Sequence, residues 1–78
     1  MANYSVYAIK NIHTGKFYKT DQLATTPVYV DRWFKATLHH MTEIRAKDWL
    51  QAVKEIFDME NDDSLQLFKI TLVKMEQV

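Results

Sequence analysis

The chain has 78 residues, 47% hydrophobic and 13% aromatic, and its ten basic and ten acidic residues give a formal net charge of zero. This length predicts one domain over residues 1–78, and the balanced charge excludes a strong overall field toward nucleic acid or an anionic membrane. Cysteine is absent, which excludes disulfides and thiolate metal sites and favours a reducing, cytoplasmic location. No apolar stretch approaches the roughly 20 residues of a membrane span, so no membrane partner is expected.

The first predicted element is a β-hairpin. Residues 4–10 are rich in β-branched and aromatic side chains, which predicts a central strand with apolar groups on both faces. Residues 11–15 end in the only glycine of the chain, which favours a turn with positive φ. Residues 16–20 then predict the return strand.

Two further strands and a helix follow. Residues 28–30 and 35–40 predict short strands on either side of a turn near 31–33. From Thr42 the apolar period changes to that of a helix, predicted from about Glu43 to Met59 with Thr42 as N-cap. The face expected to be buried carries Ala46, Trp49, Leu50, Val53, Ile56, Phe57 and, at its end, Glu60.

The last predicted element is a closing strand over residues 65–76, with Phe68, Ile70 and Leu72 on one face. The helix cannot bury its apolar stripe alone, so it must pack on the sheet. The sequence therefore predicts an α+β fold of order β-β-β-α-β, or with a fourth strand before the helix. Its antiparallel or mixed sheet of three to four strands has one amphipathic helix packed on one face and a partly exposed second face. A domain this small often gains stability from a second subunit, so a homodimer is an open alternative to a monomer.

Metal ligands are not grouped in this sequence. His39 and His40 are neighbours on a predicted strand, where adjacent side chains point to opposite faces and cannot share one ion. Asp58, Glu60 and Asp62 have the spacing of a calcium loop, but the loop's sixth and twelfth positions lack the required Gly and Glu. We therefore expect no metal site.

Catalytic motifs are equally absent from the sequence. Ser5 and Ser64 have none of the glycines of a nucleophile elbow, and a single glycine cannot form a phosphate-binding loop. These observations predict no catalytic residue, no cofactor and no enzymatic activity.

A candidate partner-binding patch is formed by Asp58, Glu60, Asp62 and Asp63, at the C-terminal end of the predicted helix. The helix dipole disfavours negative charge there. A solvated helix end is one interpretation, and a docking patch for a basic partner surface is the other. Trp33, in a loop-like turn, is a second candidate anchor for a partner protein.

The hairpin offers an alternative from a different class. Lys10, Lys16 and Lys19 lie among Phe17 and Tyr18, so bases could stack on exposed rings beside phosphate-binding lysines. Core packing is the commoner fate of such rings, and three lysines without arginine give little base-specific recognition. A small single-stranded nucleic-acid-binding protein is thus the alternative function.

The segment YAIKNIHTGKFY at residues 7–18, followed by Trp33, Lys35-Ala36 and a helix with Ala46 and Ala52, resembles the small accessory proteins of tailed bacteriophages. The resemblance covers most of the chain. It implies a host-cell cytoplasmic setting and a protein that binds and inhibits or redirects a host protein, such as a defence or transcription factor. It carries over no catalytic residue. The leading hypothesis is accordingly a non-enzymatic protein-binding module.

Overall fold

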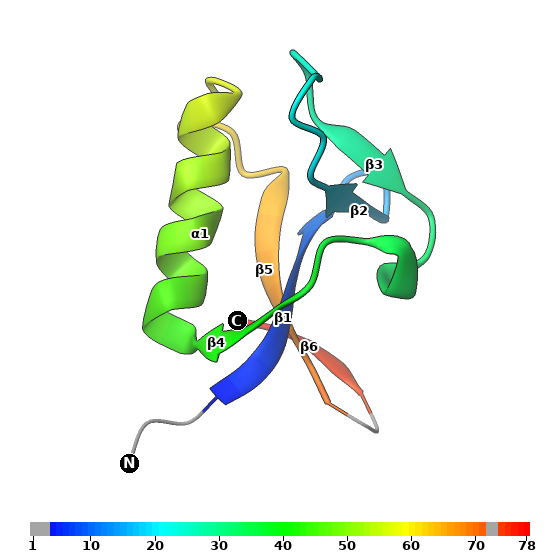
Figure 1. The fold of residues 1–78 in the computed structure, drawn as a ribbon, viewed down its shortest axis with the longest axis vertical. Helices are drawn as coiled ribbons and strands as arrows, with labels where there is room; N and C mark the ends of the chain where they lie inside the picture. The colour runs from blue at the N-terminus through cyan, green and yellow to red at the C-terminus, as the bar shows by residue number, and fades with distance from the viewer. Residues whose placement is uncertain (1–3, 72–73) are drawn as a thin grey trace.

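A computed structural model describes residues 4–71 and 74–78 of the chain. Over these residues the fold is a small α+β arrangement of six strands and one α-helix, with a short 3-10 helix between β3 and β4 (Figure 1). In chain order the elements are β1 (Tyr4–Asn11), β2 (Lys16–Lys19), β3 (Val28–Val30), η1 (Trp33–Lys35), β4 (His39–Thr42), α1 (Glu43–Ile56), β5 (Leu65–Ile70) and β6 (Met75–Gln77).

The strands form one antiparallel sheet in the order β3-β2-β1-β5-β6, with β4 also paired to β1. On one edge β1 pairs with β5 from Val6 to Asn11. On its other edge it pairs with β4 through its first half and with β2 through Lys10 and Asn11. Because β4 and β5 both run antiparallel to β1, they are parallel to each other, and a parallel connection needs a crossover. Helix α1 is that crossover, which brings it alongside the sheet (Figure 1).

The sheet has more strands than the three to four predicted. The strand expected at residues 35–40 lies later, at His39–Thr42, because Trp33–Lys35 forms the 3-10 helix instead. The closing strand expected over residues 65–76 is divided into β5 and β6. Thr71 reverses the chain by donating its N–H to the Lys74 carbonyl at 2.8 Å. Leu72, expected on the face of Phe68 and Ile70, lies outside the described residues.

The predicted hairpin is confirmed. Gly15 has φ +75°, and a Cβ placed there would meet no atom within 4 Å, so the turn requires glycine for its backbone conformation alone. Asn11 fixes the start of the turn, because its Oδ1 accepts from the N–H groups of His13 at 2.9 Å and Thr14 at 3.2 Å.

The predicted start of the helix is also confirmed. Thr42 Oγ1 accepts from the Arg45 N–H at 3.4 Å, and Glu43 and Lys47 form the expected ion pair at 3.5 Å. The helix ends at Ile56, three residues before the predicted Met59.

The early end has a local cause in the backbone after the helix. Asp58 has φ +56°, donates its N–H to the Glu55 carbonyl at 3.2 Å, and is followed by a bond from the Met59 N–H to the Lys54 carbonyl at 2.7 Å. This is the Schellman arrangement, in which a left-handed residue terminates the helix and its last carbonyls are satisfied.

The main core lies between α1 and the sheet. Its fully buried members come from three strands and the helix: Tyr7, Ile9, Tyr18, Ala46, Val53, Leu65 and Leu67. Trp49, Leu50 and Phe57 pack against this cluster from the predicted helix face. Ile56 does not, since it is 72% exposed. Its assignment to the buried face was wrong because the helix meets the sheet along a narrower arc than the apolar pattern suggests.

Candidate binding surface on the open face of the sheet

The strand register separates two apolar faces of the sheet. Directly paired residues of antiparallel strands share a face. Ile9 pairs with Leu67, and both belong to the core under α1. Val6 pairs with Ile70 and Ala8 with Phe68, so these four side chains lie on the opposite face, which α1 does not cover. We call this second surface the open face.

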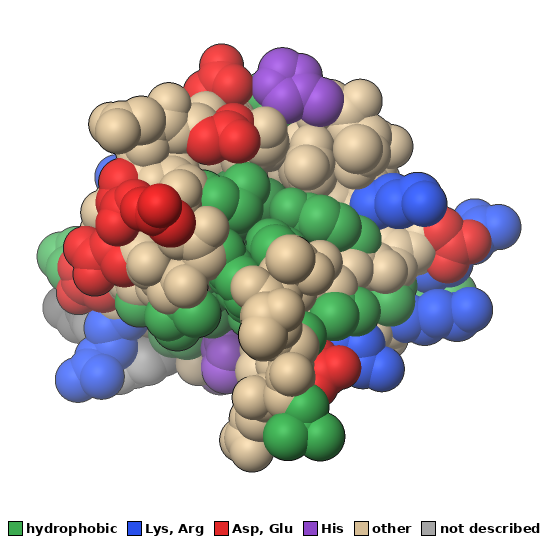
Figure 2. All heavy atoms as spheres, turned by 90° about the horizontal axis from the view of Figure 1, so that it is seen from above, with side chains coloured by type: hydrophobic (Ala, Val, Ile, Leu, Met, Phe, Trp, Pro, Cys, Tyr) green, Lys and Arg blue, Asp and Glu red, His purple; other side chains and the backbone are tan. Residues whose placement is uncertain are grey.

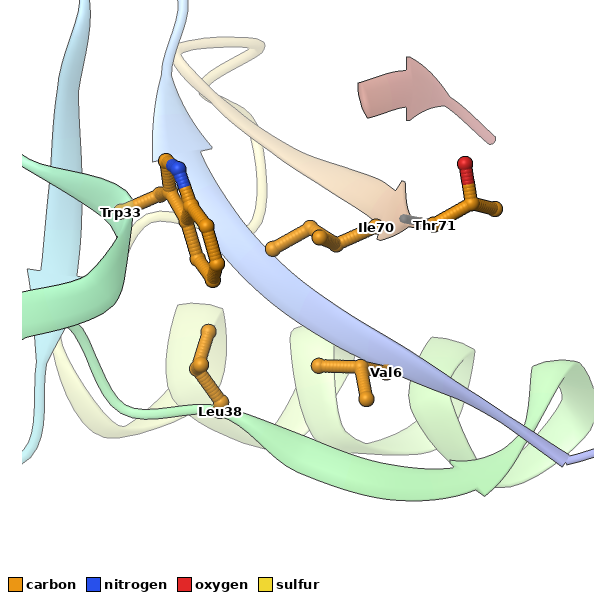
Figure 3. A pocket seen from close by; sticks show the side chains of 5 residues that line it. All are labelled: Val6, Trp33, Leu38, Ile70 and Thr71. Carbon is orange, nitrogen blue, oxygen red and sulfur yellow. The ribbon is translucent and has the colours of Figure 1, made fainter. Parts of the chain in front are cut away.

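A groove of about 550 Å³ hollows the open face, lined by Val6, Trp33, Leu38, Ile70 and Thr71. Figure 3 shows the first four side chains converging from β1, η1, the segment before β4 and the end of β5. The Thr71 hydroxyl is already engaged, because it donates to the Lys74 carbonyl at 2.9 Å and accepts from the Lys74 N–H at 3.2 Å. The lining is therefore apolar with its one hydroxyl bonded inside the protein.

Two exposed aromatic side chains stand beside the groove. Trp33 is 41% exposed although it forms one wall, and its neighbour Phe34 is 62% exposed. Their rings meet edge to face, with centroids 5.9 Å apart. The 3-10 helix η1 carries both of them, and Ala36 closes it by donating its N–H to the Trp33 carbonyl at 3.1 Å. The prediction of Trp33 as an exposed anchor agrees with this position, but its partner-binding role stays a prediction.

The remainder of the open face is partly closed by Lys10. Its Nζ lies 5.5 Å from the centroid of the Phe17 ring and 5.1 Å from that of Phe68. This position is favourable, because a cation over an aromatic face is attracted by the ring quadrupole. Phe17 is buried on this side of the sheet, at 7% exposure.

Charge is unevenly distributed around the molecule. Seen from above in Figure 2, several acidic side chains gather over the α1 side, and several basic side chains lie on the side of β3 and η1, with hydrophobic side chains between them. A few acidic side chains also lie among the basic ones. The elements beside the groove carry four basic residues: Lys10 in β1, Lys19 in β2, Lys35 in η1 and Arg32 directly before η1. The basic and acidic side chains are thus partly separated over the surface of a neutral chain.

The four acidic residues predicted as a docking patch lie together after α1, away from Trp33 and η1 on the other side of the molecule (Figure 1). Two of them hold the loop in place. Asp62 accepts from the N–H and hydroxyl of Ser64, and these hydrogen bonds lower the pKa of its carboxyl. Asp63 Oδ1 lies 3.2 Å from His13 Nε2 in the hairpin turn.

The remaining two acids have different positions. Asp58 is the left-handed residue of the Schellman turn, and Glu60 is exposed. Because α1 ends at Ile56, only Asp58 lies close to its last turn, and the helix-dipole effect falls off beyond that turn. The conflict with the dipole that motivated the docking patch is therefore smaller than predicted, and the patch itself stays a prediction.

The residues of the nucleic-acid alternative do not form one exposed surface. Phe17 and Tyr18 are 7% and 5% exposed, so neither ring offers a free face to a base. They also point to opposite sides of the sheet, since Tyr18 meets Phe57 of the helix-covered layer at 6.0 Å. Lys16 and Lys19 are exposed at the two ends of β2.

The groove was not predicted from the sequence. Leu38 was placed inside a strand, and Val6 and Ile70 were recognised only as apolar strand residues. The available signal was the apolar character of both faces of β1 and β5, which one helix cannot cover.

No protein-family model, curated protein or solved structure matches the chain. Among residues 4–71 and 74–78, no group of three or more His, Cys, Asp or Glu side chains is arranged to hold a metal ion. No helix in the described part combines the length and the apolar character that crossing a membrane requires.

Proposed function

We propose that the protein is a non-enzymatic protein-binding module that uses the open face of its sheet, and that it works in the cytoplasm. The observation that supports this most is the pairing of an apolar groove with two exposed aromatic residues, Trp33 and Phe34, on the side without a helix. Exposed apolar surface beside a concavity is the usual mark of an interaction site. Trp is also among the residues that most often carry binding energy in interfaces.

The resemblance to phage accessory proteins extends the proposal to a host protein that is inhibited or redirected when this surface covers it. The test is a pull-down from host lysate with mass spectrometry, using wild type, Trp33→Ser and Phe34→Ser. We expect both substitutions to remove the same captured protein, while circular dichroism and melting show an intact fold. Capture that both variants retain would contradict a role for the open face.

A matched variant distinguishes this surface from the acidic one. Asp58→Asn combined with Glu60→Gln removes two negative charges without disturbing the hydrogen bonds of Asp62 or the His13–Asp63 contact. Asparagine also tolerates the left-handed conformation of residue 58. We expect this double variant to capture the partner as well as wild type does. If it loses capture while Trp33→Ser and Phe34→Ser retain it, binding would be assigned to the acidic patch.

A further inference from the structure

The groove and the charges around it identify the chemistry of the segment that would bind there. We propose that the open face binds an acidic peptide segment of another protein, with one large apolar side chain of that segment seated in the groove and its carboxylates facing Lys10, Lys19, Arg32 and Lys35. This inference rests on the proposed function and names the class of partner for the same surface.

The apolar part of the proposal follows from the groove lining. Val6, Leu38 and Ile70 offer only hydrocarbon, and both hydrogen-bonding roles of the Thr71 hydroxyl are satisfied by Lys74. A nucleobase buried there would leave its polar edge without partners, which is costly. An aliphatic or aromatic side chain has no such groups, and a volume of about 550 Å³ has room for one.

The acidic part follows from unbalanced positive charge. Within residues 4–71 and 74–78, ion pairs with carboxylates are formed by His13, Lys47 and Lys74. The other Lys and Arg side chains of this part of the chain have no such partner, and four of these, Lys10, Lys19, Arg32 and Lys35, belong to the elements beside the groove. Two acids, Asp21 and Asp31, lie near these four cations in the sequence, so the positive charge on this side is only partly balanced. A negatively charged ligand is therefore attracted to this side of the molecule.

Trp33 connects the two parts, because it contributes an apolar wall and a polar rim. Figure 3 shows its six-membered ring directed toward Leu38 and Ile70, while its nitrogen lies at the far end of the side chain from Leu38. An indole nitrogen is a hydrogen-bond donor only, so this rim suits a carboxylate or a peptide carbonyl.

The experiment is a selection from a displayed library of random peptides of about ten residues, which span about 33 Å when extended, close to the 36 Å length of the molecule. Peptides are first selected for binding to wild-type protein. Those that also bind Leu38→Glu, in which a carboxylate enters the groove, are then removed. We expect enrichment of sequences with several Asp or Glu around one large apolar residue. Selected peptides should bind Arg32→Glu, Lys35→Glu protein about tenfold more weakly, mainly through slower association.

A charge variant and three further outcomes of the experiment test the proposal separately from the folding of Leu38→Glu. The pair Arg32→Glu and Lys35→Glu changes exposed side chains only, so it reports on charge even if Leu38→Glu fails to fold. Enrichment of neutral or basic peptides that still need the groove would overturn the acidic partner but leave the proposed function intact. Absence of any groove-dependent peptide would overturn the acidic peptide as partner, whereas the proposed function is decided separately by the pull-down with Trp33→Ser and Phe34→Ser. A last control measures binding of oligothymidine or oligouridine of about 20 nucleotides. If wild type binds either one tightly and in a salt-sensitive way, and the Arg32→Glu, Lys35→Glu variant does not, the partner would be a single-stranded nucleic acid and not an acidic peptide.

Discussion

The two faces of the sheet are built from the same strands, yet they are packed very differently. Under α1, Ile9 and Leu65 are fully buried and Tyr7 and Leu67 are 2% exposed. On the open face, Ala8 has no exposure and Phe17 is 7% exposed, but Val6, Phe68 and Ile70 are only half-buried, although they alternate with the core residues along β1 and β5.

The difference shows that the strands carry more apolar side chains than the core under α1 buries. An antiparallel sheet with one face in water normally alternates between apolar and polar residues. Here both faces are apolar, and the single helix covers one of them. Apolar groups kept on the uncovered side are consistent with a surface that binds a partner.

The largest expected effect comes from the helix-covered face. Leu65→Ala shortens a side chain with no exposure and should lower the free energy of unfolding by about 3–4 kcal/mol, because apolar burial is lost and a cavity is left in the core. Urea denaturation measures this, with Leu23→Ala as the control, since Leu23 is 93% exposed and its loss should cost under about 0.5 kcal/mol. Similar values for the two variants would contradict the core described above.

A smaller effect is expected on the open face. Ile70→Ala shortens a half-buried groove side chain and should cost about 1–2 kcal/mol, less than Leu65→Ala, because part of its surface is already in contact with water. The same denaturation experiment measures it. If Ile70→Ala were as destabilising as Leu65→Ala, the groove would be a closed part of the core.

Lys10→Met tests how the open face is partly closed. Methionine keeps an apolar chain over Phe17 and Phe68 but lacks the cation, so stability should fall by about 0.5–1 kcal/mol through loss of the cation–π contacts. Lys19→Met is the matched control, since no ring contact is formed by Lys19 within the described residues. Equal stability of the two variants would mean that the ring contacts contribute nothing.

The smallest effect concerns the loop that leads from the helix-covered layer back to β5. Ser64→Ala removes the hydroxyl that bonds to Asp62, so the lowered pKa of Asp62 should move up toward its ordinary value. Because folding lowers this pKa, its contribution to stability is present above about pH 4 and is lost as the pH falls through the folded-state value. An NMR titration of the Asp62 side chain measures the shift, and an unchanged pKa in Ser64→Ala would exclude the hydroxyl as its main cause.

Structural features that are determined by nearby residues could be predicted from the sequence. The turn at Gly15, the cap at Thr42 and the strand-forming character of residues 4–10 each depend on local backbone preference or pattern, and all three agree with the structure. The end of the helix was less accurate because Asp58 adopts positive φ, which asparagine or glycine would have indicated more clearly.

Features that depend on distant pairing were predicted less accurately, and the strand expected at residues 35–40 lies at His39–Thr42. Strand β4 exists because His39 to Thr42 pair with the first half of β1, and its own sequence carries only a weak strand signal. The contact of Lys10 with the Phe17 ring forms across the hairpin, and the groove depends on the register that places Val6 opposite Ile70. The candidate binding surface is thus a product of tertiary structure.

The central position of β1 also governs the order in which the protein can fold during synthesis. As β1 leaves the ribosome, the only strand soon available to it is β2, which pairs with it at Lys10 and Asn11. Its long partner β5 follows after β4 and α1. At about 5–20 residues per second, the apolar β1 waits on the order of several seconds for that partner. Contacts so distant in sequence slow folding, so β1 stays without its longest pairing until β5 has been made.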